Sequence, residues 1–348
     1  MFEYVGALHI HSVFSDGSGE LTDIAGYANE AELDFIIVTD HNTLRALTEG
    51  YEGWYNKTLV LVGCEINDKE NKNHLLAFNV SEAYSTRLPA KEYTRKVKES
   101  GGLGFLAHPH EKRNSMKEHP PYPWSEWETD DFTGIEIWNH MSQWMEGLTD
   151  QNKYNYFIHP LRSVTHPPQE TLDMWDKLSQ KRRVVGIGGI DAHAHKINLL
   201  GFFEAEVFPY KVLFKAIRTH VLTEEKCEPS NDKAELEKSK HNIYKSLELG
   251  HCFVSNFYQG DAGGFRYYAE DGINKYQMGD LVPLSENIKL KIVLPINAVI
   301  KLLKNGEIIK IFDGNIADFK VSEKGAYRVE VYINELPWIF SNHIRIGL

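Results

Sequence analysis

Cysteine is scarce in this sequence. Its 348 residues include only Cys64, Cys227 and Cys252, which lie far apart along the chain. Disulfide frameworks and cysteine-based zinc sites need several cysteines at short or regular spacings, so neither is suggested. Cys64 lies in an apolar run and is most simply a small core residue. We therefore expect a reduced, cytoplasmic protein.

Long hydrophobic runs and an excess of positive charge are also missing. The sequence contains no run of about 18 apolar residues, the length that a membrane-spanning helix needs. The first strand is expected to begin by residue 4, which leaves no room for a signal peptide. The formal net charge of −11 argues against a general nucleic-acid-binding or membrane-binding surface. A soluble protein is expected.

Short apolar runs alternate with amphipathic segments over residues 1–256. We expect strands at 4–10, 35–39, 59–64, 75–80, 103–107, 134–138 and 184–190. Helices are expected from residue 21, from Pro89 to Gly101, from residue 169, and over 234–249 with Gly250 as the cap. Alternating strands and helices indicate an α/β fold with a mainly parallel sheet, in which chemistry lies at the carboxyl ends of the strands.

The pattern changes at about Phe257. Short strand-like runs follow one another, separated by turn signals, and no helical stripe appears. Asn305-Gly306 is the strongest hairpin signal, and Asp313-Gly314 predicts a second turn. We expect two domains, an α/β domain at 1–256 and a small, all-β, sandwich-like domain at 257–348.

The N-terminal run contains the first candidate metal ligands. His9 and His11 are two residues apart in a predicted strand, so their imidazoles leave the same face. Asp16 adds a carboxylate on the turn that follows. Two parallel imidazoles with a nearby carboxylate suit a divalent metal, although two histidines on an exposed strand face would give the same pattern.

The arrangement recurs at the ends of the other predicted strands. Candidate ligands stand at or next to these ends: His41, Glu65, His74, His108, Asp191 and His193. His74 begins a run, which suits a hairpin that returns after Glu65. Because the carboxyl ends of parallel strands meet at one edge, these side chains are expected to gather in a single pocket. Asp40 could support this site or cap a helix, with equal weight.

At these residues the chain resembles the PHP (polymerase and histidinol phosphatase) family of metal-dependent phosphoesterases. The matching motifs are His9-x-His11 with Asp16-Gly17, Thr39-Asp40-His41, Gly63-Cys-Glu65, His74, Ala107-His108-Pro109 and Asp191-Ala-His193. The resemblance implies a distorted (β/α)7 TIM-like barrel with two to three divalent ions of zinc, manganese or iron. Some members carry histidine where this chain has Asp16, which leaves the identity of the metal open.

The resemblance also implies how the ligands are shared among the ions. One ion would be held by His9, His11, Glu65 and Asp191, a second by Asp16, His41 and His193, and a third by Glu65, His74 and His108. Three divalent ions among six neutral histidines and three carboxylates would leave a surplus of three positive charges. Such a site favours an anionic substrate, and metal-activated hydroxide would hydrolyse it.

A small phosphate ester is therefore the expected substrate. The catalytic candidates are Asp16, His193 and Arg113, and the substrate-binding candidates are Arg113, Arg162 and His195. Guanidinium groups bind phosphate oxygens bidentately, but both arginines could also be ordinary surface residues. The long aromatic segment 111–131 could be a lid or could pack on the barrel. The alternatives are an exonuclease on short oligonucleotides, a carbamate or ester hydrolase of the same family, and a non-catalytic metal-binding module.

Overall fold

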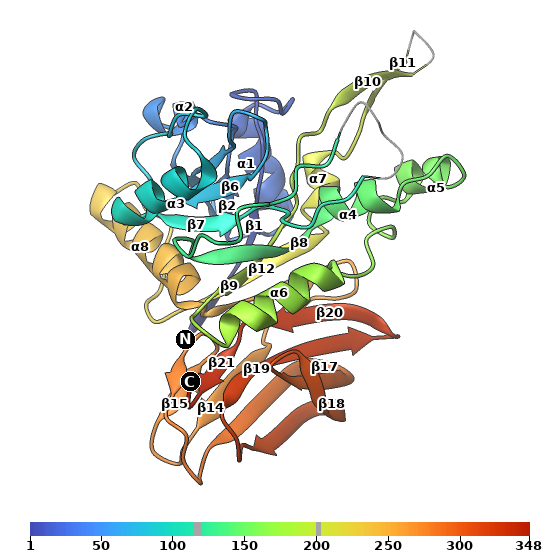
Figure 1. Ribbon diagram of the computed structural model, residues 1–348. Coiled ribbons are helices and arrows are strands. Elements are labelled where there is room, and N and C mark those ends of the chain that lie inside the picture. The colour runs from blue at the N-terminus through green and yellow to red at the C-terminus, as the bar shows by residue number, and fades with distance from the viewer. Residues whose placement is uncertain (114–119, 200–202) are drawn as a thin grey trace.

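The computed structural model describes residues 1–113, 120–199 and 203–348, and it confirms a mixed α/β protein. In Figure 1 the helices surround the strands of the blue, green and yellow part of the chain, whereas the red part consists of strands alone. Both termini lie near the junction between these two parts. Within the described ranges, no helix combines the length and the apolar character that crossing a bilayer requires.

The first sheet contains the N-terminal strands. β1 (Phe2–Leu8), β2 (Phe35–Val38) and β4 (Thr58–Val62) run parallel to one another. At one side β3 (Gly53–Tyr55) pairs antiparallel with β4. At the other side β12 (Ile217–Thr223) pairs antiparallel with β1, and β13 (Cys252–Asn256) pairs with β12. β2 and β4 are buried along their whole length. This explains their continuous apolar sequences, since a strand covered on both faces cannot alternate with polar residues.

The second sheet continues from the first at Gly63. It contains β5 (Cys64–Ile66), β6 (Leu75–Phe78), β7 (Leu103–Leu106), β8 (Gly134–Asn139) and β9 (Val185–Gly189), in this order. β5 and β6 form the expected hairpin. A Cβ atom on Gly63 would lie 2.5 Å from the carbonyl oxygen of Ala77, so the crossing between the sheets has no room for a side chain.

The expected barrel is not confirmed, because the hydrogen-bonded ladders of the two sheets do not close. β9 approaches β12 through the Gly188 amide, which donates to Thr219 Oγ1 at 3.0 Å, and Ile10 and Ala192 form only an isolated bridge. A two-stranded ribbon of β10 (Lys196–Leu199) and β11 (Phe203–Glu206) projects from this region in Figure 1.

The helices connect the strands. They are α1 (Leu21–Glu30), α2 (Arg45–Thr48), α3 (Ala90–Glu99), α4 (His140–Gly147), α5 (Lys153–Ile158), α6 (Gln169–Ser179), α7 (Tyr210–Leu213) and α8 (Lys233–Leu249). Asp232 caps the start of α8 by accepting from two backbone amides, and Gly250 ends it at φ 75°. The left-handed conformation costs glycine little, which is why this position was recognisable from the sequence.

The C-terminal strands are longer than expected. They are β14 (Arg266–Glu270), β15 (Lys275–Gln277), β16 (Leu281–Val282), β17 (Lys289–Lys304), β18 (Glu307–Lys320), β19 (Gly325–Ile333), β20 (Leu336–Ser341) and β21 (Ile344–Ile346). Asn305-Gly306 forms the expected turn, with Lys304 paired to Glu307. The second predicted turn is wrong: Asp313 and Gly314 lie inside β18, where they pair with Val299 and Ala298.

The two parts of the chain are joined by backbone pairing and by buried charge. β13 pairs with β20, so one 14-stranded sheet runs across the predicted boundary at residue 256. A junction cluster of Asp176, Arg328, Glu330 and His343 is also buried there. Arg328 Nε and Nη2 donate to the two carboxylate oxygens of Asp176 at 2.7 and 2.8 Å. The division into domains stays a prediction.

Candidate metal centre

Six strands and the loop before α1 bring the nine predicted ligands together. Seven of the nine line one cavity, and His9 and His11 are buried beside them. His9 and His11 follow β1, His41 follows β2, Glu65 lies in β5, His74 precedes β6, His108 follows β7, Asp191 and His193 follow β9, and Asp16 lies in the loop before α1. Their donor atoms form four groups in which all atoms lie within 4.8 Å of one another: His11, Asp16, His41 and His193; His9, Glu65 and His108; His9, His11 and Asp191; and His41, Glu65 and His74. Each of the nine residues belongs to at least one group.

Glu65 lies at the centre of this cluster. Its Oε2 atom is 3.1 Å from His9 Nε2 and 3.2 Å from His11 Nε2. Its Oε1 atom is 2.7 Å from His74 Nδ1 and 3.3 Å from His108 Nε2. One buried carboxylate therefore touches four imidazoles from three segments of the chain.

Several of these buried nitrogens have no hydrogen bond among the described residues. They are both ring nitrogens of His11, Nδ1 of His41 and Nδ1 of His108. His41 Nδ1 lies 3.4 Å from Glu65 Oε2, but the two atoms do not form a hydrogen bond. Buried polar atoms are normally paired. Nitrogen and oxygen donors that crowd together without pairing fit divalent metal ions, which imidazole and carboxylate ligands both accept.

In this cluster burial and neighbouring carboxylates have opposite effects on the pKa values of the histidines. Burial opposes charge on His11, but the neighbouring carboxylates of Asp191 and Glu65 outweigh it and raise the pKa of His11 to about 10. Burial likewise opposes charge on His108, yet Glu111 and Glu65 raise its pKa to about 9. For His41 burial prevails and lowers the pKa to about 4. The neighbouring carboxylates therefore favour positive charge on His11 and His108.

The backbone is strained at the same residues. His9, His108 and Asp191 have φ angles of 64°, 28° and 52°, and Ala194 has 51°. Side chains other than glycine rarely adopt this region, and such conformations cost of order 1–3 kcal/mol each. Three of the nine candidate ligands bear this cost, which indicates that their positions serve a site.

Two residues hold the ligand loops from behind. Asp40 accepts hydrogen bonds from the Ser12 amide and hydroxyl and from the Ser15 hydroxyl, each at 2.7 Å, so it fastens the loop between His11 and Asp16. It does not cap a helix through its side chain. The hydroxyl of Tyr210, which sequence reasoning missed, lies 2.7 Å from the His11 carbonyl oxygen and 3.1 Å from that of His193.

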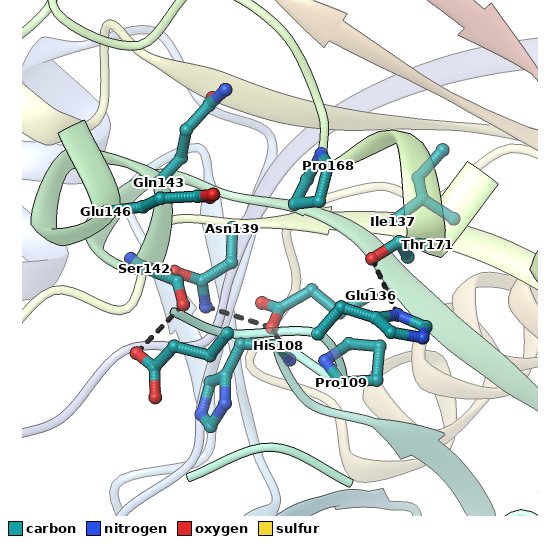
Figure 2. A pocket seen from close by; sticks show the side chains of 12 residues that line it. His108, Pro109, Glu136, Ile137, Asn139, Ser142, Gln143, Glu146, Pro168 and Thr171 are labelled. Carbon is teal, nitrogen blue, oxygen red and sulfur yellow. Dashed lines mark hydrogen bonds between the residues drawn. The ribbon is translucent and has the colours of Figure 1, made fainter. Parts of the chain in front are cut away.

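Glu136 and Asn139 were also missed. Glu136 Oε1 lies 2.9 Å from His9 Nδ1, and Asn139 Nδ2 donates to Glu136 Oε2 at 2.9 Å (Figure 2). Asn139 Nδ2 is also 3.4 Å from Asp191 Oδ2. A signal was available in the sequence, because Glu136 is a charged residue between two isoleucines of an otherwise apolar strand.

The cavity above the cluster has a volume of about 170 Å³, and it is lined by predicted ligands together with Asn71, Arg113, Tyr122 and His195. The Arg113 guanidinium donates to Glu111 Oε1 at 2.7 and 2.9 Å and lies over the Tyr122 ring, which stacks on His74. Of the aromatic residues in segment 111–131, Trp124 is buried and Trp127 stacks on His110, so packing accounts for these two.

Arg162 is not brought to this cavity. Its Nε atom donates to the Tyr258 hydroxyl at 2.8 Å, and it is absent from the described residues that line the cavity. Sequence reasoning had no means to orient this residue, because its segment carries no strand or helix signal that fixes a direction.

Comparisons with solved structures find distant similarity. A two-domain protein from Bacteroides vulgatus that contains a predicted PHP-like metal-dependent phosphoesterase has 15% identity and a TM-score of 0.45, over 99% of this chain and 95% of its own. A putative metal-dependent phosphoesterase from Bifidobacterium adolescentis has 16% identity and a TM-score of 0.36, over 58% and 90%. An amidohydrolase from Chromobacterium violaceum has 12% identity and a TM-score of 0.35, over 54% and 87%.

Comparison of the sequence with curated proteins finds no significant match, but comparison with protein families finds one. The PHP domain family matches residues 7–115. Seven of the nine predicted ligands lie in this range, from His9 to His108, whereas Asp191 and His193 lie beyond it. Residues 7–115 of this chain are therefore similar to the PHP domain family.

Proposed function

We propose that this protein is a metal-dependent phosphoesterase that hydrolyses a small phosphate monoester or diester. In this proposal residues 1–256 form one distorted (β/α)7 unit around the metal centre, and residues 257–348 form a β domain that contributes no donor to it. The observation that carries the proposal is the convergence of nine donor residues in four overlapping groups, in which four buried ring nitrogens of His11, His41 and His108 have no hydrogen bond among the described residues.

The candidate ligands would hold two to three divalent ions of zinc, manganese or iron. The division implied by the family resemblance places His9, His11, Glu65 and Asp191 on one ion, Asp16, His41 and His193 on another, and Glu65, His74 and His108 on a third. Divalent ions lower the pKa of bound water to about 7 and neutralise charge on a phosphoryl group.

The charge of the site favours an anionic substrate. Glu136 adds a fourth carboxylate to Asp16, Glu65 and Asp191, because it hydrogen-bonds to a candidate ligand. With three divalent ions the surplus would be two positive charges, one fewer than the sequence suggested. A phosphate ester still suits this site better than a neutral ester or amide.

Arg113 is the proposed phosphate-binding residue. Its guanidinium lines the cavity and is oriented by Glu111, a buried carboxylate that also accepts from the Ser142 hydroxyl and the Tyr122 amide, each at 2.8 Å. An arginine held in one orientation loses less side-chain entropy when it binds two phosphate oxygens. His195 stacks on His193 at the same cavity and is the second proposed contact to the substrate.

Asp16 and His193 are the proposed proton-transfer pair. His193 Nε2 lies 3.4 Å from Asp16 Oδ1, and the Asp16 side chain is 51% exposed, so both atoms are within reach of a leaving group in the cavity. Burial raises the pKa of Asp16, but the interactions with His193, His11 and His41 outweigh this and hold it below its usual value. Asp16 can therefore stay ionised beside His193. His193 would give a proton to the leaving oxygen only when its Nε2 atom does not bind an ion.

The test combines metal analysis with a substrate screen. The metal-free protein is reloaded with Zn²⁺, Mn²⁺ or Fe²⁺, and hydrolysis is measured on a panel of aryl and nucleoside phosphate monoesters and diesters. We expect two to three ions per chain and hydrolysis that His9→Ala abolishes. Fewer than one ion per chain after reloading, or equal hydrolysis by His9→Ala, would refute the proposal.

A further inference from the structure

Glu136 is a buried acidic residue in the middle of β8. Its relative exposure is 1%, and its neighbours Ile135 and Ile137 are fully buried. The ladder between β8 and β9 has an irregularity between Glu136 and Trp138. Behind the carboxylate lies a cavity of only about 10 Å³, which Figure 2 shows with its lining side chains. About one water fills such a space, so bulk solvent does not hydrate this carboxylate.

Protein groups replace that water on both carboxylate oxygens. Oε1 lies 2.9 Å from His9 Nδ1. Oε2 accepts from the backbone amide of His108 at 2.8 Å and from Asn139 Nδ2 at 2.9 Å. All three partners present N–H groups, which suits a carboxylate because it only accepts.

The neighbouring strand leaves space for this arrangement. Gly189 of β9 faces the carboxylate, and a Cβ atom there would lie 1.9 Å from Glu136 Oε1 and 2.9 Å from His9 Cβ. Glycine at this position is therefore required by the contact between Glu136 and His9. The end of β9 therefore leaves room for Glu136, which is not among the predicted ligands.

We propose that Glu136 is a positioning residue of the metal centre, which orients His9 and His108 together; this rests on the proposed metal-dependent function. A neutral imidazole carries one N–H and one lone pair. A carboxylate at Nδ1 selects the form with hydrogen on that atom. The lone pair is then on Nε2, which faces Glu65 Oε2 at 3.1 Å and Asp191 Oδ1 at 3.3 Å.

The second oxygen of Glu136 acts on the backbone of His108. This residue has a φ angle of 28°, an unusual value outside glycine, and its amide is held by Glu136 Oε2. His9 and His108 come from β1 and β7, and both belong to the group that contains Glu65. One carboxylate therefore sets the orientation of a ligand ring and the backbone of a second ligand. Such supporting partners typically change metal affinity 10–100-fold when they are mutated.

Glu136→Gln is the direct test. The amide has one acceptor oxygen, whereas three N–H groups point at this position, so its NH₂ group must face a donor or reverse the hydrogen position on His9. We expect affinity for Zn²⁺ to fall about 10–100-fold for the ion or ions that use His9 and His108. The ion assigned to Asp16, His41 and His193, which uses neither residue, should keep its affinity.

Glu111→Gln is the matched control. Glu111 is also a buried carboxylate that accepts from a backbone amide and from side chains, but its carboxylate hydrogen-bonds to Tyr122, Arg113 and Ser142 and to no candidate ligand. Because its charge also acts on His108, Glu111→Gln controls for the loss of a negative charge near the site. Zn²⁺ is titrated into each metal-free protein with a competing chelator, and folding is monitored by circular dichroism. If Glu136→Gln does not fold, Glu136→Asp takes its place in the test. Aspartate keeps the charge, but its side chain is too short to reach both His9 Nδ1 and the His108 amide.

Loss of affinity at some ions only, in the Glu136 variant and not in the Glu111 variant, would support the proposal. Unchanged affinities, or an equal fall at every ion together with a lower melting temperature, would overturn it, because a purely structural residue acts on the whole fold. If the wild-type protein binds no Zn²⁺, the metal centre itself fails, and the proposed function fails with it.

Discussion

The metal-centre cluster and the junction cluster both bury ionisable side chains, yet they differ in how these are paired. At the junction Arg328 meets Asp176 through two hydrogen bonds and Glu330 through a third at 2.6 Å, and only Nδ1 of His343 lacks a partner. At the metal centre the histidines surround carboxylates with several ring nitrogens unpaired and with strained backbones. A satisfied cluster holds the fold together, whereas an unsatisfied one is arranged for something that binds.

The same chemical change in the two clusters should separate these roles. Asp191→Asn removes one carboxylate charge from the metal centre, where Asp191 Oδ1 faces both His9 and His11. We expect hydrolysis of an aryl phosphate to fall by at least about a thousandfold, equivalent to about 4 kcal/mol in the barrier. The measurements are initial rates and bound metal, with circular dichroism as the control for folding. A variant that loses its fold but keeps full activity per folded molecule would contradict the comparison.

Asp176→Asn should have the opposite profile. It leaves the buried guanidinium of Arg328 with only Glu330 as a charged partner. Breaking a buried ion pair costs about 3–5 kcal/mol, so the urea midpoint should fall clearly. Metal content and the rate of hydrolysis below the melting temperature should stay close to wild type. If Asp176→Asn removed the metal, the two clusters would not be independent.

The pH dependence of stability offers a smaller and finer test on the metal-free protein. The raised pKa values of His11, about 10, and of His108, about 9, give stability that is fully present below pH 6.5 and lost as the pH rises towards 9–10. His41, with its pKa lowered to about 4, acts in the opposite sense below pH 6.5. At the junction the pKa of Asp176 is lowered, because Arg328 and His343 outweigh burial, so that contribution is lost only in acid.

Urea unfolding at pH 6.5 and pH 9 should therefore show a less stable metal-free protein at pH 9. Metal ions should abolish this difference, since they replace the protons that hold the carboxylates. Equal midpoints at the two pH values in the metal-free protein would show that the histidines are not charged in the way described.

Much of the fold could be predicted because its signals are local. The short apolar runs, the Gly250 cap of α8 and the Asn305-Gly306 turn each depend on a few neighbouring residues, and the structure has them where they were expected. Asp313-Gly314 failed because pairing with β17 extends β18 through it, which overrides the local turn preference. The closed barrel was not confirmed, because closure depends on contacts between β9 and the first sheet, over long separations in the chain.

The candidate site was partly predictable for the same reason. Strand ends gave the nine donors, but the residues behind them required coordinates: Glu136 reaches His9 across 127 positions, and Tyr210 reaches the His11 carbonyl across 199. Arg162 is a residue that was predicted for the site but does not lie there. Its guanidinium could bind a phosphate, but in the structure it donates to the Tyr258 hydroxyl.

The sequence by itself determined the α/β alternation, the change to an all-β region after residue 256, and the positions of donors at strand ends. Hydrophobic periodicity and turn chemistry are local properties, so they can be read without coordinates. Only the tertiary structure decided that Glu65 is surrounded by imidazoles, that Gly189 makes room for Glu136, and that Asp176 is paired with Arg328. These depend on distances between strands that lie far apart in the chain, and close packing fixes such distances only when the whole chain is folded.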